Sequence, residues 1–89
     1  MNDDLRYAVL ARKQLANGRA RWLRRQLGYS QRQMAQAVGV SDVCILSWEK
    51  GHWNPHYEHA VALGRELAQM SELFNAAVEA EDDVSTALV

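Results

Sequence analysis

The sequence predicts an all-α protein, a compact bundle of five to six short helices. Apolar residues recur three and four positions apart, as they do on the inward face of a helix. Glycine ends most of these apolar segments, and serine stands directly before several of them, where a helix cap is expected. The 89 residues, 48% hydrophobic and 24% charged, suit one globular domain and are too few for two.

Six segments carry the helical pattern. They cover residues 3–15, 19–27, 31–38, 42–50, 56–69 and 72–80. The residues expected to face the core are Leu5, Ala8, Val9, Ala20, Leu23, Leu27, Met34, Ala35, Val38, Ile45, Trp48, Ala60, Leu63 and Leu67. Ser71 is expected to cap the sixth helix, and residues 81–89 are expected to fray. Trp22 and Trp53 fall outside the core pattern, and we expect Trp53 to pack on Pro55.

Charge is distributed unevenly along the chain. The net charge is −1, but residues 1–65 carry +5 and residues 66–89 carry −6, with no Lys or Arg in the second part. From Arg6 to Arg32 there are eight basic residues and no acidic one. Such a segment is typical of a surface that binds a polyanion, although a solvated basic helix face gives the same pattern.

The composition argues against several classes of function. No apolar run reaches the roughly 18 residues of a membrane span, and the acidic N-terminus is unlike a secretory signal, so we expect a cytoplasmic protein. Cys44 is the only cysteine, and His52, His56 and His59 lack a further metal ligand at a suitable spacing. There is no glycine-rich phosphate loop and no paired catalytic residue, so the sequence predicts no enzyme, no cofactor and no metal site.

The most informative stretch runs from Ser30 to Gly51. It contains a helix of eight residues, a turn at Gly39 and a second helix. Gln33 completes a capping box with Ser30. Ala35 is small where the second helix would cross it closely, and Gly39 allows the positive φ of a tight turn. Two short helices joined in this way form a helix-turn-helix, whose second helix can enter the major groove of DNA.

This stretch resembles a known family. The segment LRRQLGYSQRQMAQAVGVSDVCILSWEKG (residues 23–51), followed by Pro55, is similar to the helix-turn-helix domain of phage repressors and Cro proteins. This XRE-like family includes many bacterial regulators and antitoxins. The similarity covers about residues 20–67, with Met34 in place of the usual leucine. It implies a lambda-repressor-like fold with three parts. These are an N-terminal helical extension (1–16), the helix-turn-helix domain (17–70), and a C-terminal helix with an acidic tail (71–89).

The resemblance also implies which residues contact DNA. They are Gln31, Arg32, Ser41, Asp42, Val43, Leu46, Ser47, Lys50, His52 and Asn54. Asp42, Val43 and Ser47 take the positions that contact base edges. Gln31 and Ser41 take positions that contact phosphate, and the Gln31 position contacts a base as well.

Two further features of the motif bear on its role. Arg24 and Glu49 match a pair that commonly forms an internal salt bridge in the family. The expected outer face of the second helix is poor in long polar side chains, with Val43 and Leu46 at its centre. Phosphate contacts and DNA shape would therefore contribute much of the affinity and specificity.

The resemblance implies a transcription regulator that binds double-stranded DNA as a homodimer. A palindromic operator with half-sites about 34 Å apart would match the dimer, and repression by occlusion is the simplest outcome. The expected dimer contacts are Leu73, Phe74, Ala77 and Val78, with the N-terminal extension as second choice. The alternative is that these four residues pack on the domain's own core. Two alternatives remain open. One is an antitoxin that binds a toxin and regulates its own operon, and the other is a helix-turn-helix module that binds protein instead of DNA.

Overall fold

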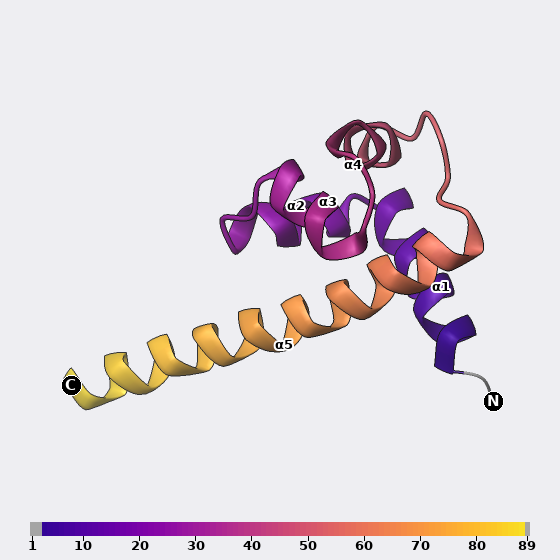
Figure 1. Ribbon diagram of the computed structural model, residues 1–89. Helices are drawn as coiled ribbons and strands as arrows, with labels where there is room; N and C mark the ends of the chain where they lie inside the picture. Colours follow the sequence, from indigo (N-terminus) through magenta and orange to yellow (C-terminus); the bar gives the residue numbers. More distant parts are fainter. Residues whose placement is uncertain (1–2, 89) are drawn as a thin grey trace.

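The protein folds into helices only, which confirms the all-α prediction. The computed structural model describes residues 3–88, with side chains through residue 80. The helices are α1 (Asp3–Ala16), α2 (Arg19–Gln26), α3 (Gln31–Val38), α4 (Asp42–Glu49) and α5 (Tyr57–Leu88), as Figure 1 shows. Within the described residues there is no strand, and no helix is both long and apolar enough to cross a membrane.

The core lies where the four N-terminal helices meet the first half of α5. Its buried apolar residues are Ala8, Ala11, Ala20, Leu23, Met34, Ala35, Val38, Ile45, Trp48, Ala60, Leu63, Leu67 and Met70. Every helix therefore contributes at least two residues to one continuous cluster. Helices α1 to α4, of 14, 8, 8 and 8 residues, are marginal by themselves in water, so the core shared with α5 stabilises them.

Helices α1 and α5 cross at very short distance. Gly64 of α5 is buried, and a Cβ on it would lie 2.5 Å from the carbonyl carbon of Tyr7 in α1. The fully buried residues of α1 are Ala8 and Ala11, whose small side chains suit such a close approach. Only glycine fits at the Gly64 position unless the two helices move apart.

This crossing explains a wrong sequence prediction for α1. Leu5 and Val9 were expected to face the core with Ala8, but they are 48% and 42% exposed. The buried residues are Ala8 and Ala11, three positions apart on the face that meets α5. A periodic apolar pattern favours the larger side chains for the core, whereas the closeness of the helix backbones admits only alanine here.

The predicted break before residue 72 is also wrong. Ser71 lies inside α5, which runs without interruption from Tyr57 to Leu88. Gly64 is the last glycine of the chain, and the residues after it are rich in Ala, Leu, Glu and Met, which favour helix. A serine caps a helix only where the chain before it leaves the helical conformation, and at Ser71 it does not. The helix also continues through residues 81–88, for which the sequence predicts fraying.

Candidate nucleic-acid interface

Local hydrogen bonds define where α3 and α4 begin. The Ser30 hydroxyl accepts from the Gln33 backbone N–H at 3.0 Å, and the Gln33 side-chain oxygen accepts from the Ser30 N–H at 2.9 Å. The Ser41 hydroxyl accepts from the Cys44 N–H at 3.4 Å at the start of α4. Gly39, between the two helices, has a left-handed φ of 87°. These contacts join α3 and α4 through a turn too short to move independently of them.

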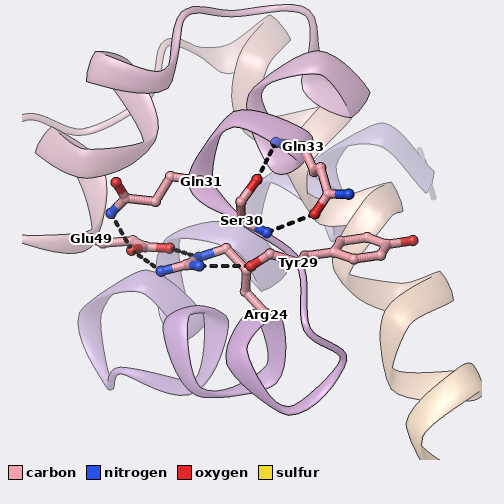
Figure 2. A network of polar contacts seen from close by, with 6 residues as sticks. All are labelled: Arg24, Tyr29, Ser30, Gln31, Gln33 and Glu49. Atoms are coloured by element: carbon pink, nitrogen blue, oxygen red, sulfur yellow. Dashed lines mark hydrogen bonds and ion pairs between the residues drawn. The ribbon is translucent and has the colours of Figure 1, made fainter.

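A buried network connects this pair of helices to α2 (Figure 2). Arg24 of α2 donates from Nε to Glu49 Oε2 at 2.7 Å and from Nη2 to Glu49 Oε1 at 3.0 Å. Its Nη1 donates to the carbonyl oxygen of Tyr29 at 2.8 Å, directly before the cap of α3. Only 9% of the Arg24 side chain and 5% of the Glu49 side chain are exposed. The pair is therefore bidentate, and it is removed from water.

The network holds three segments in one geometry. A single guanidinium joins α2, the end of α4 and the backbone that enters α3. Bidentate pairing adds directional specificity, while the desolvation of both charges offsets much of the attraction. The main effect of the Arg24–Glu49 pair is therefore to orient α4 relative to α2 and α3.

Gln31 joins the same network. Its side-chain amide Nε2 donates to Glu49 Oε1 at 3.1 Å, so the first residue of α3 is tied to the last residue of α4 (Figure 2). From the sequence, Gln31 is expected to contact DNA and Glu49 to pair with Arg24, with no contact between Gln31 and Glu49. They lie 18 positions apart, and no local pattern links residues at that separation.

Comparison with known proteins identifies the family. A family model described as "Helix-turn-helix" matches residues 21–73, more than half of the chain. The chain belongs to the Cro/C1-type helix-turn-helix family. It is accordingly a DNA-binding transcription regulator of this type, and the resemblance drawn from the motif is confirmed. The comparison with curated proteins gave no match, and neither did the comparison with solved structures.

In this helix-turn-helix domain, most of the expected DNA-contacting residues lie on the surface of α3, α4 and the adjoining loops. Exposed are Arg32, Ser41, Asp42, Val43, Leu46, Lys50, His52 and Asn54, and Gln31 is half-buried. At the start of α4, Asp42 Oδ1 accepts from the Val43 N–H at 3.1 Å. Val43 is 57% and Leu46 36% exposed, so the outer side of α4 presents apolar side chains to solvent.

Ser47 departs from the expected outer face of α4. It is buried, with 9% of its surface exposed, whereas Val43 one turn earlier is exposed. Ser47 also lies one turn after Cys44, which packs partly against the core. It therefore stands at the border between the two faces of α4, and its short side chain is covered where a longer one would extend into solvent.

Internal pairing lowers the number of basic side chains between Arg6 and Arg32 that are free to bind a polyanion. Of the eight Lys and Arg residues in this segment, Arg24 is buried against Glu49, and the other seven are exposed. Arg19 lies over the ring of Trp22, 4.2 Å from its centroid. The Trp22 ring packs edge-on against the Phe74 ring of α5, with the ring centroids 5.1 Å apart. Trp22, which lies outside the apolar pattern of the sequence, therefore connects α2 to α5. The sequence predicts neither contact. Arg19 and Trp22 lie outside the apolar periodicity, and Trp22 and Phe74 lie far apart in the sequence.

A groove lies beside the C-terminal end of α4. It is lined by Cys44, Trp48, His52, Trp53, Asn54, Pro55, His56 and His59. Trp53 lines this groove together with Pro55 but remains 62% exposed, so packing accounts for only part of its surface. Despite the three histidines and the cysteine, no group of three metal-ligating side chains converges among the described residues.

Proposed function

We propose that this regulator binds a palindromic operator as a homodimer, with α4 of each copy in the major groove, and that it represses transcription by occlusion. The main support is the exposed outer side of α4, with Val43 57% exposed, on a helix oriented by the buried Arg24–Glu49 pair. A helix held in this way loses little further conformational freedom on binding. Two copies would place their α4 helices one helical turn of DNA apart, about 34 Å.

Base recognition is assigned to the outer side of α4. Val43 and Leu46 offer apolar surface suited to thymine methyl groups, and the Asp42 carboxylate can accept from the amino group of cytosine. We place Ser47 at the edge of this set because of its burial. A face with so few polar groups makes few bidentate contacts, so we expect modest discrimination at each base pair.

Phosphate contacts are assigned to the two ends of the helix-turn-helix. Gln31 and Ser41 stand at the beginnings of α3 and α4, where the positive end of the helix dipole favours a phosphate. Arg32 adds a positive charge beside α3. After α4, the residues assigned to the DNA backbone are Lys50, His52 and Asn54. These contacts release counterions, so the affinity should fall steeply as the salt concentration rises.

The proposed activity requires no cofactor and no metal, because DNA recognition of this kind is non-covalent. We accordingly infer a non-enzymatic protein that acts in the cytoplasm. Its one cysteine in the described residues, Cys44, is free and half-buried, as suits a reducing compartment.

Selection of bound sequences from a random DNA pool, followed by gel shift, tests this proposal. Gln31→Ala should weaken binding of the selected site by about tenfold through a lost phosphate or base contact. Val43→Ala should weaken it by a similar factor and relax specificity at one base pair. Gln69→Ala, an exposed change on α5, is the matched control and should leave binding unaltered. The assignment is wrong if neither Gln31→Ala nor Val43→Ala lowers the affinity by even about fivefold.

A second candidate function is protein binding by the same side of α4. The exposure of Val43 and Leu46 favours it, since exposed apolar side chains next to each other are typical of protein interfaces. An antitoxin would combine both activities by binding DNA and a toxin. Failure to enrich any DNA sequence, or an affinity for DNA independent of salt, would favour the protein-binding module. Recovery of a stoichiometric toxin with the protein, alongside DNA binding, would favour the antitoxin.

A further inference from the structure

The C-terminal part of α5 extends beyond the domain. Among the residues of this helix whose side chains the structure describes, up to residue 80, Met70 is the last that is fully buried and Phe74 is the last that packs against the core. Residues 75–80 are all exposed, and the helix continues to Leu88 as a projecting rod (Figure 1). We call residues 75–88 the C-terminal arm. A helix of this length is marginal in water without a packing partner.

The outer face of α1 carries an apolar groove that the domain leaves uncovered. Its lining residues are Leu5, Arg6, Val9, Leu10 and Lys13. Leu5 and Val9 are 48% and 42% exposed, and Arg6 and Lys13 are exposed as well. We call this surface the α1 groove. It combines an apolar floor with cationic residues, and the nearest acid to Arg6 is Asp3, at a weak 4.0 Å.

The C-terminal arm has the complementary character. Leu73, just before it, is 56% exposed, and Ala77 and Val78 within it are exposed as well. Residues 66–89 contain six acidic residues and no Lys or Arg. Glu72 and Glu79 are exposed beside the apolar residues of this part of α5. At 1.5 Å per residue the arm is about 21 Å long, which matches the 14 residues of α1.

We infer that in the homodimer the C-terminal arm of each copy packs into the α1 groove of the other copy. This arrangement rests on the proposed homodimer and specifies its contact. Pairing of two arms would bring acids against acids, because this part of α5 contains no Lys or Arg. An antiparallel pairing of two α1 helices could set Asp3 and Asp4 against Lys13, but it would leave the apolar residues of both arms uncovered. The contact between an arm and a groove joins opposite charges and also covers both apolar surfaces.

The occupant of the groove is a second copy because the arm cannot reach it within one chain. The first half of α5 already crosses α1 at Gly64, and from there the helix continues in one direction without a break. A two-fold axis repeats the contact, so each dimer contains two identical arm–groove pairs. In Figure 1, the C-terminal part of α5 extends away from α4, so the arm does not cover α4 of its own copy.

Reciprocal charge reversal tests the inference. The groove variant Arg6→Glu/Lys13→Glu is paired with an arm variant, Glu72→Lys/Glu79→Lys, which changes one glutamate just before the arm and one within it. Each variant turns attraction into repulsion in both contacts of a homodimer. We expect each variant alone to have a dimer dissociation constant at least about tenfold above that of the wild type by sedimentation equilibrium. An equimolar mixture should form a heterodimer of near wild-type affinity, because both of its contacts again join opposite charges. Arg21→Glu/Arg25→Glu, with the same change of charge on exposed sites of α2, is the control and should dimerise normally.

Other results would overturn the inference. A groove variant that dimerises like the wild type, with an arm variant that pairs best with the wild type, would establish contact between two arms. An arm variant that dimerises like the wild type, with a groove variant that pairs best with the wild type, would establish contact between two α1 helices.

A wild type that stays monomeric up to about 100 µM, well above ordinary dimer affinities, would overturn the homodimer itself. Binding of a single half-site, measured separately, would then show whether DNA recognition still holds. Circular dichroism checks each fold, and Arg6→Gln/Lys13→Gln replaces the groove variant if its helicity falls.

Discussion

Replacement of Gly64 by alanine tests the close crossing of α1 and α5. The new Cβ would lie 2.8 Å from the Tyr7 Cα and 2.5 Å from its carbonyl carbon. Both atoms belong to the backbone of α1, so no rotamer change can relieve the contact. The Tyr7 carbonyl oxygen lies closer still, so the helices must move apart by roughly 1.4 Å to restore ordinary van der Waals separation, and a gap of even about 1 Å already forfeits up to half of each dispersion contact.

The expected loss of stability follows from two opposing terms. Overpacking of a core costs about 1–3 kcal/mol, and the rigid backbone contact at Gly64 places this site near the upper end. Alanine also stabilises the helix by about 1 kcal/mol relative to glycine, because it is the better helix former. The free energy of unfolding should therefore fall by about 2 kcal/mol, which corresponds to a Tm lower by roughly 8–16 °C in a domain of this size.

Thermal unfolding followed by circular dichroism measures this effect. Ala37→Gly, an exposed change in α3, is the control for helix propensity and should cost about 1 kcal/mol. If Gly64→Ala left the Tm unchanged or raised it, helix propensity alone would govern the site. The close crossing of α1 and α5, and with it the explanation of the exposed Leu5 and Val9, would then be wrong.

Three further substitutions address other contacts. Glu49→Gln leaves the Arg24 guanidinium buried without its counterion. It should lower the free energy of unfolding, measured by urea titration, by about 3–5 kcal/mol, and a loss below about 1 kcal/mol would contradict a buried pair. Gly39→Ala forces alanine to adopt φ of 87° and should cost about 1–2 kcal/mol by the same assay, unless the turn is not left-handed. Phe74→Ala removes the edge contact with Trp22, so the tryptophan emission should shift to longer wavelength, and an unchanged spectrum would argue against the contact.

Much of the helix-turn-helix follows from local signals in the sequence. Ser30 with Gln33, and Ser41, cap helices through hydrogen bonds to residues three positions away. Gly39 ends α3 because glycine adopts positive φ without strain. Such interactions depend on the identity of near neighbours in the chain, so they can be predicted before any tertiary contact is known. The Arg24–Glu49 pair spans 25 positions and was accessible only through the family pattern.

The differences between prediction and structure arise from contacts between distant segments. Leu5 and Val9 face outward because the backbones of α1 and α5 approach too closely for large side chains. Ser71 continues a helix because the preceding turns are already helical, and serine alone carries no information about that. The sequence alone therefore establishes the family, the capped helices of the motif and the charge asymmetry. Which faces are covered, and which remain exposed, depends on how closely helices far apart in the chain pack together.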